Sequence, residues 1–304
     1  MGYQLGERLP QGRDRLRLGQ AALAISPLCI GMTTSWRTIP AAFDAGINCF
    51  FFSADMHWPL YEPTRKGLAE VLQRGPSVRD EIVVFVVSYC AQPEFCRLPF
   101  TEALTAVDGL GRIDVMLAGG AYGRDIKLRM PPYYEHRRNK FLGVSAVGAT
   151  FHDRRAAREA VEERETDIVF VRYSARHPGA RTDLFPHIAT RSPILVFNFK
   201  STQGHIAPAR LAELGLPETY WRPKITDHYR FVLTRPEIDG LLCSPKDPRE
   251  VEELIAAMEA GPLDDEEEAH IVRLSLLDRK LARLRAPGTP SAGTENQAAR
   301  DANP

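Results

Sequence analysis

One stretch decides the fold: Gly46-Ile47-Asn48-Cys49-Phe50-Phe51-Phe52-Ser53-Ala54-Asp55-Met56-His57. It begins as a strand that is apolar on both faces, and it ends abruptly in the polar residues Ser53, Asp55 and His57. Such strands are typical of parallel sheets that are covered by helices on both faces. In barrels and doubly wound sheets, the carboxyl end of each strand opens into the active-site cleft. We therefore expect the polar end of this stretch to lie at a functional site.

The rest of the chain repeats a rhythm of short apolar runs separated by helical stretches. Eight strand candidates lie at residues 28–31, 47–53, 82–87, 114–117, 142–145, 168–172, 194–199 and 240–243. Several stretches between them carry apolar residues at helical spacing, such as Leu68, Val71 and Leu72. Eight such units within about 250 residues predict an α/β fold of the (β/α)8 TIM barrel type.

Outside this rhythm the chain has short additions at both ends. We expect a flexible N-terminus over residues 1–13, then one barrel domain over residues 14–285 that begins with a hairpin at 16–25. Residues 264–285 predict a closing helix, because its acidic residues come first and its basic residues last, which suits the helix dipole. Residues 286–304 are mostly Pro, Gly, Ser, Thr and Ala, which predicts a disordered tail.

Composition narrows the class of protein. The 304 residues include 39 Lys+Arg and 39 Asp+Glu, so net charge gives no reason to expect nucleic acid or an anionic membrane as partner. Five cysteines are an odd number, and three lie in apolar runs, which favours reduced thiols over a disulfide framework. The start has no signal-like segment, and no apolar run is long enough to span a bilayer. These features predict a cytoplasmic protein and leave its oligomeric state open.

Several segments together resemble the aldo-keto reductase family. They are DAGINCFFFSADMH (44–57), RDEIVVFVV (79–87), RIDVMLAGG (112–120), FLGVSA (141–146), TDIVFVRYSARHPGA (166–180) and YRFVLTRPEIDGLLCSPKDPREVEELIAAMEAGPL (229–263). These segments are similar to the second to sixth strands of that family and to its eighth unit. The resemblance covers roughly residues 16–275 and implies the TIM barrel fold and, in ordinary members, NADP(H)-dependent carbonyl reduction.

The catalytic tetrad of that family does not carry over. Its tyrosine acid falls at His57, its aspartate at Phe52, its lysine at Val87 or Ser88, and its histidine at Gly119. The lysine and aspartate are needed because a phenol with a pKa near 10 is a poor acid at neutral pH. Residues 82–90 contain no Lys and residues 113–120 contain no His. The resemblance therefore implies the fold and argues against its ordinary reaction.

The cofactor site resembles that of the family only in part. The resemblance places cofactor contacts at Ser145, Ser244, Lys246 and Glu253. Ser145 matches a serine that contacts nicotinamide, and Lys246 matches an arginine that pairs with the 2′-phosphate. Three other contacts of the family fall at residues that differ from its pattern: Ala146, Phe170 and Leu254. The helix after Pro248 still offers amide donors to an anion. Bound NADP(H) and a lost cofactor therefore both stay open.

Polar residues after the second and third strands are the candidates for proton transfer. His57 with Asp55 leads, because a histidine near pKa 6.5 acts as acid or base without further support. Tyr89 could supply the missing phenol, or it could be structural, and His57 and Trp58 could simply plug the barrel. Four residues form a cluster that hints at a metal: His57, Cys90, Glu94 and Cys96. The Cys-x5-Cys spacing is not usual for zinc, so we expect no metal.

Polar residues after the sixth and seventh strands are the candidates for substrate binding. Arg172 and Tyr173 end one strand, and Asn198 and Lys200 end the next. An arginine and a lysine at adjacent strand ends could hold a carboxylate or phosphate, or they could pair with acidic residues of the loops. His152 and His177 follow the fifth and sixth strands and could lie at the rim.

Two functions follow from these residues. The first is an enzyme of the aldo-keto reductase type that acts on a small polar or anionic metabolite by altered acid/base chemistry. In it His57, Asp55 and Tyr89 are catalytic, and the substrate-binding residues are Arg172, Tyr173, Asn198, Lys200 and Trp58. The second is a barrel without catalysis that senses a ligand or serves as a partner subunit.

Overall fold

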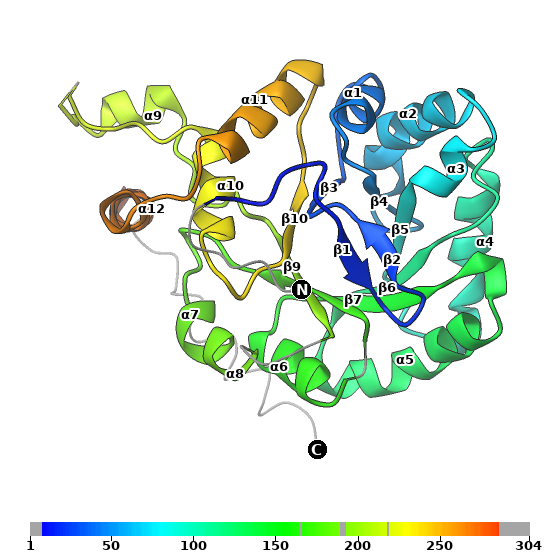
Figure 1. Cartoon of the computed structure of the whole chain (residues 1–304). Coiled ribbons are helices and arrows are strands. Elements are labelled where there is room, and N and C mark those ends of the chain that lie inside the picture. The colour runs from blue at the N-terminus through cyan, green and yellow to red at the C-terminus, as the bar shows by residue number, and fades with distance from the viewer. Residues whose placement is uncertain (1–7, 165, 189–192, 218, 286–304) are drawn as a thin grey trace.

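The computed structural model describes residues 8–164, 166–188, 193–217 and 219–285. At its centre eight parallel strands form a closed barrel (Figure 1). Their order around the barrel is β10 (Gly240–Cys243), β3 (Leu28–Ile30), β4 (Cys49–Ser53), β5 (Val83–Ser88), β6 (Val115–Ala121), β7 (Ala146–Phe151), β8 (Ile168–Arg172) and β9 (Leu195–Phe199). The predicted TIM barrel is therefore confirmed.

Helices surround the barrel (Figure 1). They are α1 (Thr38–Asp44), α2 (Glu62–Leu72), α3 (Val78–Glu81), α4 (Arg97–Thr105), α5 (Gly123–Arg138), α6 (Arg154–Glu162), α7 (Ala180–Asp183), α8 (Phe185–Ile188), α9 (Pro208–Glu213), α10 (Ile225–Leu233), α11 (Pro248–Glu259) and α12 (Asp265–Arg285). Three short 3-10 turns join them: η1 (Trp58–Tyr61), η2 (Pro93–Phe95) and η3 (Phe141–Gly143). Within the described ranges no helix combines the length and apolar character needed to cross a bilayer.

Side chains along each strand alternate between the barrel interior and the layer beneath the helices. In β4, Phe51 faces the interior, whereas Phe52 packs beneath the helices. Phe170 of β8 lies deep in the interior, and its ring centroid is 5.8, 6.1 and 5.6 Å from those of Phe51, Phe85 and Phe197. The interior is therefore a packed aromatic core, and binding must take place above it, at the strand ends.

The predicted hairpin is present as the antiparallel pair β1 (Leu16–Leu18) and β2 (Leu23–Ile25), which lies in front of the barrel in Figure 1. Its residues Leu18 and Ile25 are buried in the same cluster as the barrel interior. Residues 8–13, predicted to belong to a flexible N-terminus, are packed instead. Leu9 is fully buried, and Gln11 donates a hydrogen bond to the carbonyl of Met258 at 3.1 Å. The predicted tail at 286–304 lies outside the described residues, as do residues 1–7.

Polar side chains fix the register at the amino ends of alternate strands. Asn48, Asp114, Asp167 and Asp239 stand just before β4, β6, β8 and β10. Each accepts the backbone N–H of a residue in, or just before, the preceding strand, at 2.7–2.8 Å. A one-residue slip would break these bonds and turn every side chain of the strand to the opposite face.

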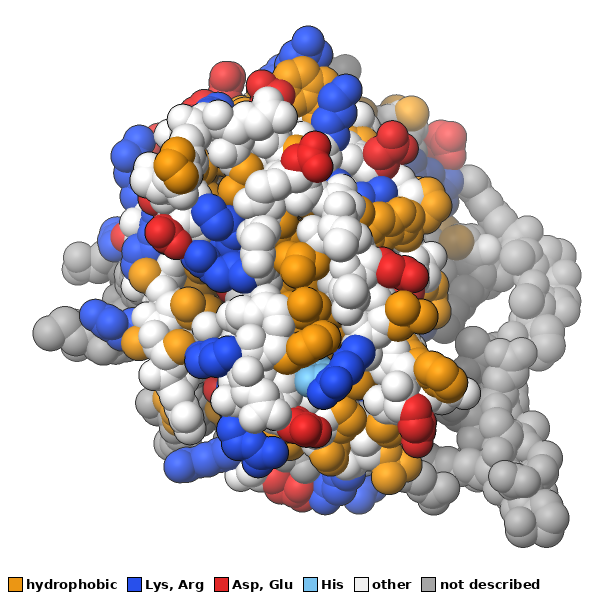
Figure 2. All heavy atoms as spheres, turned by 90° about the vertical axis from the view of Figure 1, so that its right-hand side faces the viewer, with side chains coloured by type: hydrophobic (Ala, Val, Ile, Leu, Met, Phe, Trp, Pro, Cys, Tyr) orange, Lys and Arg blue, Asp and Glu red, His pale blue; other side chains and the backbone are white. Residues whose placement is uncertain are grey.

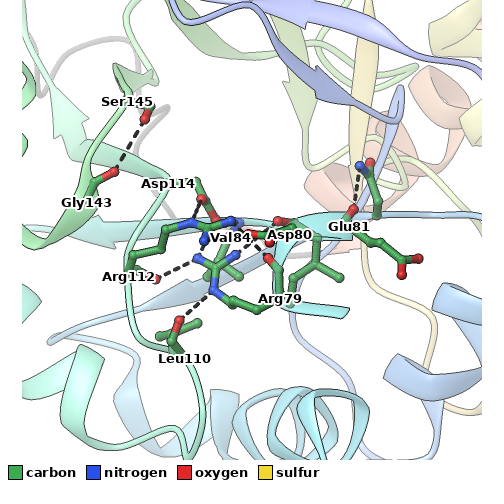
Figure 3. A network of polar contacts seen from close by, with 11 residues as sticks. Arg79, Asp80, Glu81, Val84, Leu110, Arg112, Asp114, Gly143 and Ser145 are labelled. Atoms are coloured by element: carbon green, nitrogen blue, oxygen red, sulfur yellow. Dashed lines mark hydrogen bonds and ion pairs between the residues drawn. The ribbon is translucent and has the colours of Figure 1, made fainter. Parts of the chain in front are cut away.

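A buried arginine strengthens one of these contacts (Figure 3). Arg79 is 8% exposed and pairs with Asp114 at 2.8 Å, while it donates to three backbone carbonyls. Arg112 binds the second oxygen of Asp114 at 3.0 Å. In barrels of this type, polar groups at the amino ends of the strands contribute to stability rather than to catalysis.

One local prediction is wrong, and one helix was not predicted. Strand β7 covers residues 146–151 rather than 142–145, because Leu142 and Gly143 have positive φ angles of 51° and 82° and form a turn. Helix α5 was not predicted, since Pro131 and Pro132 lie inside it and proline normally ends a helix. The other seven strands lie where the apolar runs placed them, with small differences at their ends.

The outer surface carries no large area of one charge sign on the face that Figure 2 presents. Basic and acidic side chains are interspersed there with hydrophobic ones. This distribution agrees with the zero formal net charge of the sequence.

Candidate active site at the mouth of the barrel

We call the carboxyl ends of the barrel strands, with the loops that follow them, the mouth. Asp55 joins two of its loops. Its Oδ2 accepts hydrogen bonds from Ser88 Oγ at 2.6 Å and from the Tyr89 N–H at 2.8 Å, and its Oδ1 accepts from the Met56 N–H at 2.6 Å. Charged acceptors make strong hydrogen bonds, so this carboxylate ties the end of β4 to the end of β5. Asp55 lies at the mouth and is fixed there.

Tyr89 lies across the end of β6. A Cβ added to Gly119 would be 2.8 Å from Tyr89 Cδ1, so the ring fills the space that a side chain at position 119 would need. This explains a glycine at the position aligned with the family's histidine. Burial, and next the charge of Asp55, raise the pKa of Tyr89 above its usual value. Its ring also meets that of His57 edge-on, with centroids 5.4 Å apart.

A second phenol, Tyr61, was missed by sequence reasoning. It ends the turn η1, and its ring centroid lies 6.1 Å from that of Phe51 in the barrel interior. Burial, followed by the charges of Tyr89 and Cys29, raises the pKa of Tyr61 strongly. The sequence contains only a weak indication of this role. Tyr61 follows His57 by four residues, a spacing that would place the two side chains on one side of a helical turn. His57, Tyr61 and Tyr89 therefore form one polar group at the ends of β4 and β5.

The opposite side of the mouth is basic. In barrel order β8 and β9 lie across from β4 and β5, and they carry Arg172 and Lys200. Neither side chain forms an ion pair or a hydrogen bond with any described residue, and Arg172 Nε is buried without a partner. The alternative in which these residues pair with acidic loop residues is therefore not seen in the described part of the chain. The positive charge on this side of the mouth is therefore not neutralised by any described acidic residue.

The pKa values of two histidines are lowered in part by this positive charge. His152, after β7, meets Phe199 edge-on at 5.1 Å, and its pKa is lowered by burial and then by Lys200 and Arg172. In the loop after β8, the pKa of His177 is lowered to about 4 by burial and then by nearby arginines, of which Arg172 contributes most. Both histidines are therefore neutral near pH 7, and the fixed positive charge comes from Arg172 and Lys200.

Two predicted substrate contacts face away from the mouth. Tyr173 is fully buried, stacks on Phe231 with centroids 5.4 Å apart, and accepts a hydrogen bond from Arg181 Nε at 2.6 Å. Asn198 is also buried, and it donates to the carbonyls of Val171 and Tyr173. The reason is the alternation of a strand: because Arg172 points to the mouth, its neighbour Tyr173 points to the helices. Tyr173 and Asn198 are therefore structural.

Trp58 is a third predicted contact, and its ring turns away from the barrel interior. Its ring meets Phe52 edge-on at 6.5 Å, beneath the helices, and Arg65 stacks on it at 3.6 Å.

The residues of the suggested metal cluster do not converge at one point. Cys96 is buried beside His136, with Sγ 3.5 Å from Nε2. Within the described ranges no three side chains of metal-ligand type gather at one point.

Comparison with known proteins gives a clear result for the fold. No model of a known protein family and no curated protein sequence matches the chain. Many solved structures do match it. An aldo-keto reductase, AKR11C1 from Bacillus halodurans in its holo form, has a TM-score of 0.65 and 17% identity over 86% of this chain and 96% of its own. This chain has the aldo-keto reductase fold. The glycerol dehydrogenase AKR11B4 from Gluconobacter oxydans is similar at a TM-score of 0.62 and 15% identity, covering 92% of this chain and 99% of its own.

The aldo-keto reductase AKR11C1 has a holo form, so the fit of this chain to the family's cofactor, NADP(H), matters here. Ser145 does not fit. It precedes β7, and its N–H donates to the carbonyl of Asp114, so it lies at the amino ends of the strands (Figure 3). The nicotinamide would lie at the opposite end, and the prediction was wrong because β7 starts later than expected. Phe170, aligned with an amide that binds nicotinamide, belongs to the packed core.

The phosphate end of the cofactor site is closed by the chain's own carboxylates. Asp247 Oδ1 accepts the Glu250 N–H at 3.0 Å, and Glu250 Oε2 accepts the Lys246 N–H at 2.8 Å. The Lys246 amine lies 3.8 Å from Glu250. A phosphate at the start of a helix needs free amides and a positive field, and these contacts occupy the amides of Lys246 and Glu250.

The other two predicted cofactor residues are also engaged. The N–H of Ser244 donates to Tyr229 Oη at 3.3 Å, and Glu253 pairs with Arg249 at 3.1 Å on the surface of α11. The residues that the resemblance assigns to NADP(H) are therefore engaged elsewhere in the fold, and we assign no chemical step to this cofactor.

Proposed function

We propose that this chain is an enzyme that binds a small anionic metabolite at the mouth of an aldo-keto reductase barrel and moves a proton on it. The free guanidinium of Arg172 is the observation that supports this most. A buried donor without a partner is costly, so such groups usually meet a ligand or water. Arg172 and the nearby Lys200 suit a carboxylate or phosphate group, since both donate charged hydrogen bonds.

The opposite side of the mouth supplies the groups for proton transfer. His57 is exposed, and an imidazole can serve as a general acid or base. Tyr61 and Tyr89 stay protonated there, because the pKa of each phenol is raised. Protonated phenols donate hydrogen bonds to an oxygen on which negative charge develops, while His57 takes or returns the proton. This combination suits a redox-neutral reaction, such as an isomerisation of a carbonyl compound that carries an acid group.

A barrel that binds the same anion without turning it over is the second candidate. It is favoured by Asp55, whose hydrogen bonds to Ser88, Tyr89 and Met56 all serve to hold the loops. A carboxylate used in this way gives His57 no direct support. The two candidates share the binding site and differ only in turnover.

Deuterium exchange separates the candidates. A panel of small keto acids and sugar phosphates is first tested for thermal stabilisation of the protein, and stabilising compounds are then incubated with it in D2O and followed by NMR. We expect deuterium to enter the carbon next to the carbonyl group, and His57→Gln to slow this at least tenfold. His187→Gln is the matched control, because His187 is exposed on α8. Binding without deuterium exchange would contradict the enzyme and support the ligand-sensing barrel. If no anion stabilises the protein, both candidate functions are contradicted.

A further inference from the structure

We infer that Arg129 of α5 is a positioning residue that sets the slot in which the ring of Tyr89 lies. The inference rests on the proposed role of Tyr89 at the mouth. Arg129 is 3% exposed. Its Nη1 donates to the carbonyl of Gly119 at 2.9 Å and pairs with Asp125 at 3.0 Å, and its Nη2 donates to the carbonyl of Ser88 at 3.1 Å.

The two carbonyls lie on either side of the slot. Ser88 directly precedes Tyr89, and Gly119 forms the surface on which the Tyr89 ring rests, at a distance that leaves no room for a Cβ. One guanidinium therefore fixes the spacing between the end of β5 and the end of β6. A planar fork with several donors in fixed directions suits this task, and a flexible ammonium group does so less well.

The hydrogen bonds continue to the mouth. Ser88, whose carbonyl Arg129 holds, donates its hydroxyl to Asp55 Oδ2 at 2.6 Å, and the same oxygen accepts the N–H of Tyr89 at 2.8 Å. Arg129 and Asp55 thus hold the Ser88–Tyr89 segment from two sides. Because both restraints act on the backbone next to Tyr89, they determine where its phenol points.

A purely structural role explains the placement of Arg129 less well. Its Nε makes no hydrogen bond of ordinary geometry, and the buried hydroxyl of Tyr133, one turn further along α5, meets the Arg129 guanidinium only in a contact of poor geometry. Apolar residues of similar size would fill such a site without these costs. A buried charge is thus kept at the one point where it can bind both strand ends.

The slot also keeps Tyr89 partly away from water. Burial is the main reason that the pKa of Tyr89 is raised. If the slot opens, water reaches the phenol, and its pKa should fall toward the usual value near 10. A change in this value therefore reports on the slot and requires no substrate.

The test is the ionisation of Tyr89 in the absence of ligand. Absorbance near 295 nm is recorded after rapid pH jumps, before alkaline unfolding, and the signal of Tyr89→Phe is subtracted in each background to isolate Tyr89. We expect Arg129→Lys, which keeps the positive charge and loses the fork, to lower the midpoint of Tyr89 toward the usual value. Arg129→Met also removes a positive charge, which by itself raises the pKa of a phenol, so a lowered midpoint in this variant shows that water reaches the ring. Arg155→Met, at an exposed site on α6, should leave it unchanged.

An unchanged midpoint in folded Arg129→Lys would overturn the inference, and thermal unfolding of each variant shows whether it is folded. If Arg129→Lys does not fold, a raised or unchanged midpoint in Arg129→Met overturns it. Gly119→Ala provides an independent check, because its Cβ pushes the ring out of the slot from the other side and should also lower the midpoint. A shift with Gly119→Ala but with neither Arg129 variant would assign the slot to Gly119 alone. Failure of the proposed proton transfer would leave these midpoints as expected, so the two proposals fail separately.

Discussion

A buried histidine far from the mouth should make this fold sensitive to acid. His228 of α10 is 2% exposed, and its Nδ1 has no hydrogen-bond partner. It lines a cavity of about 10 Å³ under α12, and its ring centroid lies 5.5 Å from that of His205. Burial, and then the charge of His205, lower the pKa of His228 to about 3 from the usual 6.5. The folded state therefore keeps His228 neutral over a range in which the unfolded chain protonates it.

The sign and size of the effect follow from this difference. The unfolded state binds the proton first, so stability is complete above pH 6.5 and is lost as pH falls from 6.5 toward about 3. Once pH is below both values, the loss reaches about 5 kcal/mol. At about pH 5 the same relation gives about 2 kcal/mol. Such a loss is a large fraction of the stability of an ordinary domain.

Urea unfolding at about pH 7.5 and about pH 5 measures this loss. The wild-type protein should lose about 2 kcal/mol more than His228→Gln between the two pH values. His187→Gln, at an exposed position, should behave as the wild type does. Equal pH dependence of the wild type and His228→Gln would refute the reasoning, because it would mean that His228 is hydrated or paired in the folded state.

Three further predictions concern other parts of the molecule. NADPH should not bind below about 1 mM in a fluorescence titration, because carboxylates close the start of α11; saturation below that concentration would contradict this. Arg79→Met should lower the free energy of unfolding by about 3–5 kcal/mol, since it leaves Asp114 buried beside only the half-exposed Arg112; a loss under about 1 kcal/mol in urea unfolding would count against it. Arg172→Met should raise the pKa of His177 from about 4 toward its usual value in an NMR titration, and an unchanged value would show that Arg172 lies too far away.

The sequence was sufficient for the fold because the barrel strands are buried on both faces. Runs such as Cys49–Ser53 and Val83–Ser88 are apolar throughout, and apolar runs between helical stretches leave few alternatives. The strand β7 was misplaced, because a left-handed turn at Leu142 and Gly143 interrupts an apolar run without a proline or a charge to mark it. Propensity and pattern do not reveal such a turn.

The candidate site was harder to predict, because the direction of a side chain at a strand end depends on register. Arg172 and Tyr173 are neighbours in the chain, yet one faces the mouth and the other is buried among helices. Tyr61 reaches the mouth only through the turn η1, whose geometry is not encoded by any strand pattern. The need for a glycine at position 119 depends on the ring of Tyr89, which lies against it from another strand and which no local sequence pattern reveals.

The central claim is that the mouth binds a small anion through Arg172. Calorimetric titration with the most stabilising keto acid or sugar phosphate of the panel tests it most directly, in the wild type and in Arg172→Met. We predict at least about tenfold weaker binding in the variant, because charged hydrogen bonds contribute about 1.5–3 kcal/mol. The unfolding temperature without ligand should not fall, since Arg172 has no partner among the described residues. Equal affinity in the two proteins, or an Arg172→Met variant that is less stable without ligand, would contradict the account.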